Sequence, residues 1–175
     1  MERKEVIDVI NHYRHDVLND IQLVKGYASM GKLDKVNDIV TTIIHKAHEE
    51  RKLTRLQCPH FFLWLLQFNW TYNQFQIQYQ VSEQVDPLTE KDIGICDAFE
   101  QLISTLEAHV KADQLYEGMI IIEEKGNINV TFTGSFVNIT ECHQHLDKIN
   151  FVQDVHVTEE KCNVTFSFQK ELVNK

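Results

Sequence analysis

The chain has 175 residues, of which 43% are hydrophobic and 25% are charged, and its formal net charge is −9 at pH 7. This composition is that of a globular protein with one large core or two small ones, and no apolar run approaches the ~20 residues of a membrane-spanning helix. The charge is uneven, because residues 1–56 hold ten basic and nine acidic residues, whereas residues 57–175 hold seven lysines and seventeen acids. The acidic remainder argues against nucleic acid or an anionic membrane as a partner, since both would repel it.

Residues 1–56 predict two helices joined by a short turn. Apolar residues recur at steps of three and four and predict a first helix over Lys4–Ser29. Gly31 ends this helix, and Asp34 is expected to cap a second amphipathic helix that continues to Leu56. Such a hairpin has a long apolar seam and nothing to cover it. We therefore expect a homodimer, in which two hairpins form a four-helix bundle.

The dipeptide Cys58-Pro59 marks a boundary, because the residue before proline disfavours helix. We expect a helical dimerisation domain over residues 1–57 and a second domain over 58–175. Hydrophobic periodicity there predicts helices at 60–72, 89–112 and 139–149 and strands at 75–81, 118–123, 128–133, 152–157 and 162–168. The fold class is therefore α+β, with the second domain built as a layer of helices on a mixed sheet.

His15 is the most informative residue of the first predicted helix. At 3.6 residues per turn it lies about 200° from Val17 of the apolar stripe, and Asn19 and Gln22 lie near it on the same polar strip. Neutral imidazole is a good nucleophile toward phosphorus, and the resulting N–P bond is reactive enough to pass the phosphoryl group onward. An exposed histidine of this kind is suited to relaying phosphate between proteins.

The residues around His15 fit the same chemistry. Asp16 could orient the ring, Asn19 and Gln22 can donate hydrogen bonds, and Arg14 can offset the charge of a phosphate. Arg14 and Asp16 lie about 100° to either side of His15, so neither has to contact it directly. The alternative is a solvated histidine without a role, which is the common case for a single surface residue.

The longer string from Arg14 to Gly26, Arg-His-Asp-Val-Leu-Asn-Asp-Ile-Gln-Leu-Val-Lys-Gly, favours a functional His15 over a solvated histidine without a role. It resembles the dimerisation helix of the sporulation initiation phosphotransferase B family, and the resemblance extends over residues 10–82. The resemblance implies a dimeric bundle that displays one histidine per subunit. It also implies that His15 accepts a phosphoryl group from the aspartate of one response-regulator receiver domain and passes it to another, with Asp16, Asn19 and Gln22 around it.

The second domain resembles the ATP-binding domain of histidine kinases in its order of elements, but its nucleotide motifs are missing. Ser104 and Ala108 stand where the resemblance would place asparagines, and Gly134 is the one glycine after Val130. A triphosphate needs a glycine-rich loop for close backbone approach. We therefore expect the second domain to have a structural role and not to bind a nucleotide. The chain is expected to have no cofactor of its own, and Mg²⁺ is expected to be supplied by the partner receiver domain.

Several alternatives remain open. The chain could be a truncated sensor kinase, which would use ATP, or a non-catalytic dimer that sequesters response regulators. Cys142, His143 and His145 could suggest a zinc site. The two histidines are two residues apart on a predicted helix, which points their rings to different sides, so no metal site is expected. The four cysteines are widely spaced and are expected to be reduced. The first residues have no hydrophobic signal core, which favours the cytoplasm.

Overall fold

The structure is a computed structural model that describes residues 3–169, with side chains from residue 6 onward. The chain is an α+β protein, as the sequence predicts, and it divides into two compact units, Met1–Glu50 and Arg51–Lys175. Each unit has its own packing and is described by itself. Within residues 3–169, no helix is both long enough and apolar enough to cross a membrane.

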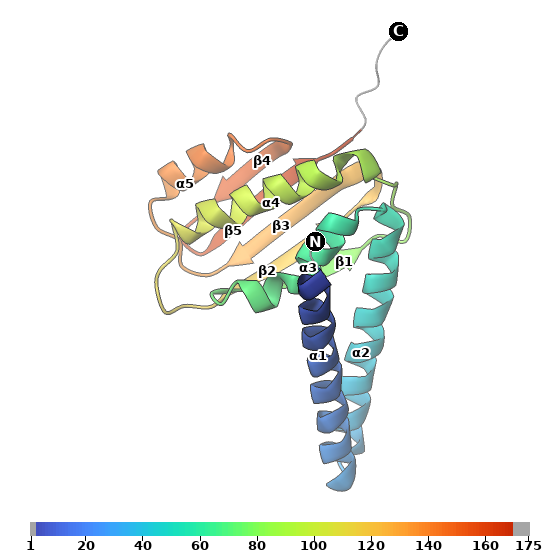
Figure 1. The fold of residues 1–175 in the computed structure, drawn as a ribbon. Coiled ribbons are helices and arrows are strands. Elements are labelled where there is room, and N and C mark those ends of the chain that lie inside the picture. Colours follow the sequence, from blue (N-terminus) through green and yellow to red (C-terminus); the bar gives the residue numbers. More distant parts are fainter. Residues whose placement is uncertain (1–2, 170–175) are drawn as a thin grey trace. The chain divides into compact units, whose positions relative to one another are not determined.

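The first unit is a pair of antiparallel helices, α1 (Arg3–Ser29) and α2 (Leu33–Leu53) (Figure 1). Gly31 lies between them with φ of +69°, a left-handed conformation that glycine adopts without strain. The N–H of Lys32 donates to the Tyr27 carbonyl (3.0 Å) and closes the turn. The prediction that Asp34 caps α2 was wrong by two residues, because α2 begins at Leu33, which puts the cap at Lys32 and Asp34 inside the first turn.

The apolar stripe of the first unit remains largely exposed in the single chain. Ile10 is 57% exposed and Ile21 is 54% exposed on α1, and Ile44 is 53% exposed on α2. Side chains of this size are usually buried when they recur at helical spacing. The two helices therefore leave an apolar face that the chain itself does not cover within the described residues.

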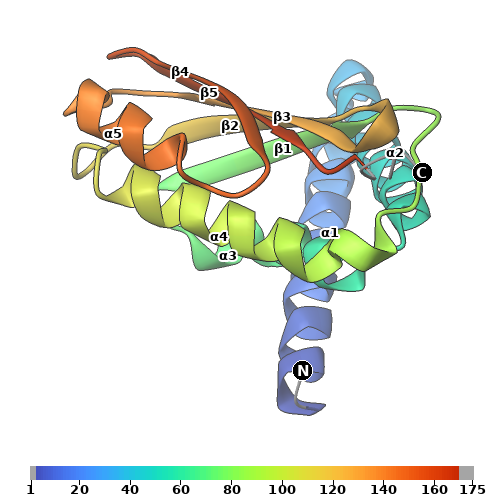
Figure 2. The same cartoon turned by 90° about the horizontal axis from the view of Figure 1, so that it is seen from above.

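The second unit contains a five-stranded sheet in the order β1-β2-β3-β5-β4. The strands are β1 (Phe75–Val81), β2 (Tyr116–Ile122), β3 (Asn127–Thr133), β4 (Val152–Val157) and β5 (Lys161–Ser167). The pair β1–β2 is parallel and the other pairs are antiparallel, so the sheet is mixed as predicted. The helices α3 (Pro59–Thr71), α4 (Asp92–Glu107) and α5 (Ile139–Leu146) cover one face of it (Figure 2).

The predicted helix over 89–112 is shorter in the structure. A 3₁₀ turn, η2 (Thr89–Lys91), precedes α4, which ends at Glu107. Shortly afterwards Val110 pairs with Phe136, and Asp113 has a positive φ of 63°, so the chain leaves the helical path there. Two further 3₁₀ turns are present: η1 (Thr54–Leu56) follows α2, and η3 (Glu124–Gly126) joins β2 to β3. The ends of two other elements also differ from the prediction, since β2 begins at Tyr116 and α5 ends at Leu146.

The N-terminus of α3 is held by a buried carboxylate. Asp92, 6% exposed, accepts hydrogen bonds from the N–H groups of His60 (3.0 Å) and Phe61 (2.9 Å) and lies 2.8 Å from His60 Nδ1. Free N–H groups at a helix N-terminus need such partners. Burial acts to raise the pKa of Asp92, but the hydrogen bonds from Phe61 and His60 outweigh it and the pKa is lowered. Phe61 in turn packs against Phe99 in the core (ring centroids 4.9 Å apart).

Candidate functional site

His15 lies on the open surface of α1, and its side chain is 73% exposed. Its ring Nδ1 is 3.2 Å from the side-chain amide nitrogen of Asn19, one turn further along the helix. The same ring nitrogen is 3.6 Å from Oδ1 of Asp16. The structure thus brings together three of the five residues that the sequence places at this site, all around one edge of the imidazole.

These contacts bear on which ring nitrogen carries the proton. A carboxylate can only accept, so Asp16 favours a proton on Nδ1 of His15. The Asn19 amide has a donor at one end and an acceptor at the other, and the two ends are interchangeable by a flip of the side chain. In the structure the amide nitrogen of Asn19 faces Nδ1; the flipped amide, with its oxygen toward the ring, accepts the same proton as Asp16. In the tautomer with its proton on Nδ1, Nε2 of the exposed ring keeps its lone pair, which is what a nucleophile needs.

Among the described residues, no hydrogen bond or ion pair joins Arg14 or Gln22 to His15. The guanidinium of Arg14 donates to Oδ1 of Asn11 (3.0 Å), one turn back along α1. Gln22 is exposed one turn beyond Asn19. Leu18, which the sequence did not single out, lies three residues after His15 and is 49% exposed, so an apolar side chain borders the polar strip.

A hydrogen bond between α1 and α2, close to His15, holds the two helices in register along their axes. The hydroxyl of Tyr13 donates to Oε2 of Glu50 (3.0 Å), which joins α1 to α2. Burial, followed by the hydrogen bond and the charge of Glu50, raises the pKa of Tyr13. The sequence placed Tyr13 on the apolar stripe. Its hydrogen bond to Glu50, 37 residues away on α2, could not be predicted from the local sequence pattern.

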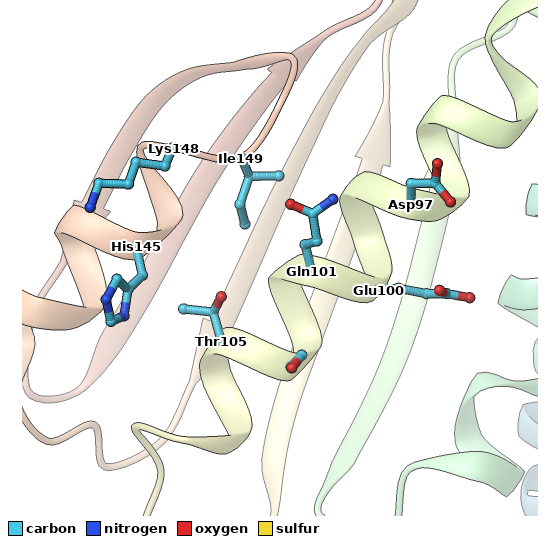
Figure 3. Close-up of a pocket in the computed structure, with 8 residues that line it drawn as sticks. Asp97, Glu100, Gln101, Thr105, His145, Lys148 and Ile149 are labelled. Carbon is cyan, nitrogen blue, oxygen red and sulfur yellow. The ribbon is translucent and has the colours of Figure 1, made fainter.

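A groove of about 430 Å³ lies between α4 and α5 in the second unit (Figure 3). Asp97 and Glu100 bring two carboxylates to its lining, and Lys148 brings one cation. Ser104, one of the positions where the resemblance would place an asparagine, also lines the groove. Gly134 packs directly against Tyr116, because a Cβ added to it would overlap the ring of Tyr116. A triphosphate would meet acidic side chains here and no glycine-rich backbone.

Near one end of this groove, the structure gathers His109, Glu141 and His145. One ligand atom of each residue lies within 4.8 Å of those of the other two. In the sequence, His145 stands out only beside its neighbours Cys142 and His143. The usable signal was the spacing of Glu141 and His145 at i,i+4, which places both on one side of a helix. The third member, His109, comes from beyond the end of α4 and could not be identified by spacing.

Two family models match the chain in succession. The alpha-helical domain of the SpoOB-type sensor kinases matches residues 1–56, and the C-terminal domain of sporulation initiation phosphotransferase B matches residues 57–169. The sporulation initiation phosphotransferase B of Bacillus subtilis (strain 168) is 29% identical over 109 residues, which cover 62% of this chain and 57% of that relative. The matched length is thus less than two thirds of the relative. Because the second model matches more than half of the chain, the protein belongs to the sporulation initiation phosphotransferase B family.

Proposed function

We propose that the protein is a phosphorelay phosphotransferase that carries phosphate on His15 between the aspartates of two response-regulator receiver domains. The family membership supports a phosphotransferase in a sporulation phosphorelay. The single observation that carries the assignment of the residue is the exposure of His15, 73%, together with the contacts that Asp16 and Asn19 make at its Nδ1. The cytoplasm, where response regulators act, is the proposed compartment.

The chemistry balances without a co-reactant. The Nε2 lone pair of His15 attacks the phosphorus of the aspartyl phosphate, an N–P bond forms, and the P–O bond to the aspartate breaks, leaving a carboxylate. The second transfer reverses these steps on another receiver. The transition state for such a transfer is loose, so positioning and charge neutralisation provide most of the catalysis. In this proposal, a Mg²⁺ bound by the receiver supplies charge neutralisation, while Asp16 and Asn19 orient the imidazole of His15.

We also propose that the working form is a homodimer with a four-helix bundle. Ile10, Ile21 and Ile44 leave an apolar face on the hairpin that is more than half exposed at each of these positions. A second copy of the same face is self-complementary, as a two-fold interface requires. His15 is about 140° from Ile10 around α1 by helical geometry, so the dimer would leave the imidazole open to the receiver.

The test is transfer of labelled phosphate from a purified receiver domain, phosphorylated on its aspartate, to the full chain without ATP. We expect acid-labile label on the wild-type protein and on His12→Gln, and none on His15→Gln. His12 is the matched control, since it lies three residues away on the same helix. Equal labelling of the His15→Gln protein would refute the acceptor assignment. Labelling that requires ATP would favour a truncated sensor kinase, and absence of label despite binding would favour a non-catalytic regulator-binding dimer.

A further inference from the structure

We propose that His109, Glu141 and His145 form a transition-metal site that takes Zn²⁺ and joins the end of α4 to α5. The three residues offer two imidazole nitrogens and one carboxylate oxygen within 4.8 Å of one another. Two histidines and a glutamate are an established ligand set for zinc, which leaves a fourth position for water or another ligand. This site is separate from His15 and does not depend on phosphate transfer there.

His109 is already arranged as a metal ligand. Its Nδ1 lies 2.7 Å from the carbonyl oxygen of Thr105, and a carbonyl can only accept, so Nδ1 must carry the proton. Nε2 therefore keeps its lone pair. Metal-bound histidines in proteins have this same support, in which the other ring nitrogen donates to a backbone carbonyl or a carboxylate.

The position of His109 is also fixed. The residue is only 3% exposed, its N–H donates to the Leu106 carbonyl (2.8 Å), and its own carbonyl accepts from Val137 N–H (2.8 Å). Its ring meets the ring of His145 edge-on, with centroids 5.7 Å apart. A rigid buried ligand thus faces a second imidazole that comes from a different helix.

The other two ligands are exposed, so their side chains are free to adjust and complete the site. Glu141 and His145 are both exposed and stand one turn apart on α5, and His145 projects toward the end of α4 that carries Thr105 (Figure 3). Ligands about 2.0–2.1 Å from a tetrahedral zinc ion are separated by roughly 3.3–3.5 Å. A side-chain movement of roughly an ångström at Glu141 or His145 closes the remaining distance, since exposed rotamers interconvert readily.

The surrounding charges are compatible with a cation. Asp97 and Glu100 line the same groove further along α4 and add negative potential, which Lys148, on the same segment as His145, offsets in part (Figure 3). The open coordination position would be reached by solvent near the groove. The expected consequence of metal binding is a tighter attachment of α5 to α4, because the ion bonds to both segments.

The experiment uses the full chain with Zn²⁺ as the probe and hydrogen exchange to localise the effect. We expect Zn²⁺ to slow amide exchange in the peptide covering α5 in the wild type and in His143→Ala. His143 is the matched control, an exposed histidine on the same helix two residues from His145. His145→Ala and Glu141→Gln should lose this protection and weaken zinc binding at this site by at least about tenfold.

Localised exchange separates this site from the histidines of the helical unit, which could also bind zinc. His145 and Glu141 are exposed, so their substitution leaves the fold intact, and the metal-free exchange pattern of each variant verifies it. If Zn²⁺ leaves α5 exchange unchanged in the wild type, or protects His145→Ala to the same extent, the proposed site is wrong.

Discussion

The side-chain amide of Asn19 lies 3.2 Å from Nδ1 of His15, one helical turn away on the exposed side of α1. A contact at Nδ1 affects the far nitrogen of the ring, because it determines where the single proton of the neutral imidazole resides. Asp16, 3.6 Å from the same nitrogen, can only accept that proton, and the flipped amide of Asn19 accepts it as well. The arrangement gives Asn19 an orienting role rather than a direct part in bond making.

Replacement of Asn19 tests this role. Asn19→Ala removes one net hydrogen bond of about 1 kcal/mol at the ring and should slow phosphate transfer by about 3–10-fold. Single-turnover transfer from a phosphorylated receiver measures it. Asn37→Ala, an exposed asparagine on α2, is the control and should transfer at the wild-type rate. A wild-type rate for Asn19→Ala would mean that the amide does not orient His15.

The apolar face of the hairpin gives a second prediction. Ile10→Asp would place a carboxylate in the proposed dimer seam, where its desolvation is costly, so the variant should be monomeric in analytical ultracentrifugation. Ile93→Asp is the matched control: Ile93 is 55% exposed, close to the 57% of Ile10, but lies on α4 in the other unit. A wild-type protein that sediments as a monomer at micromolar concentration would contradict the dimer.

Leu18 gives a third prediction, concerning the receiver. This side chain lies three residues after His15 and is 49% exposed, so an incoming receiver can bury it. Leu18→Ala should weaken receiver binding by about 1–2 kcal/mol without changing the stability of the chain. Titration calorimetry against a receiver domain measures the first quantity and thermal unfolding the second. Unchanged affinity would place the receiver elsewhere on α1.

The carboxylate at the start of α3 gives a fourth prediction, on stability. Asp92→Asn should lower the free energy of unfolding by about 1–3 kcal/mol at pH 7, because the buried N–H groups of His60 and Phe61 lose a charged acceptor. Urea denaturation measures this difference. His60→Ala is the comparison variant and should cost less, since it leaves both backbone donors in place.

The same variant has a defined pH dependence. The pKa of Asp92 in the folded protein is below its ordinary value of 3.8. A carboxylate of this kind stabilises the fold fully above the unfolded pKa, and the stabilisation is lost as the pH falls through the folded pKa. The difference between wild type and Asp92→Asn should therefore be constant above about pH 5 and shrink below about pH 4. A difference that grows in acid would contradict the account.

Local patterns were enough to predict much of the fold. The strict alternation of Phe75–Val81 and the apolar spacing of Val152–Val157 predicted β1 and β4 with the bounds that the structure has. The helix over 89–112 was overextended, because Ala108, His109 and Val110 read as helical by themselves. The pairing of Val110 with Phe136 is a tertiary contact that no local pattern reports.

Some contacts of the candidate site could likewise be predicted from the sequence, and others could not. The proximity of His15, Asp16 and Asn19 follows from helical geometry, so the sequence could predict it. The contact of Arg14 with Asn11 depends on a rotamer and could not be predicted. His109 lies 36 residues before His145, and only the packing of α5 against the end of α4 brings their rings together.

Mass-spectrometric mapping of the phosphorylated residue tests the central claim most directly. The wild-type chain is incubated with an aspartyl-phosphorylated receiver domain and no ATP, and is then digested under alkaline conditions that preserve phosphohistidine. The account predicts a phosphoryl group on the peptide that contains His15, at that residue, and its disappearance when an unphosphorylated second receiver is added. Phosphate on another residue, or none on the chain while the receiver loses its own only to water, would contradict it.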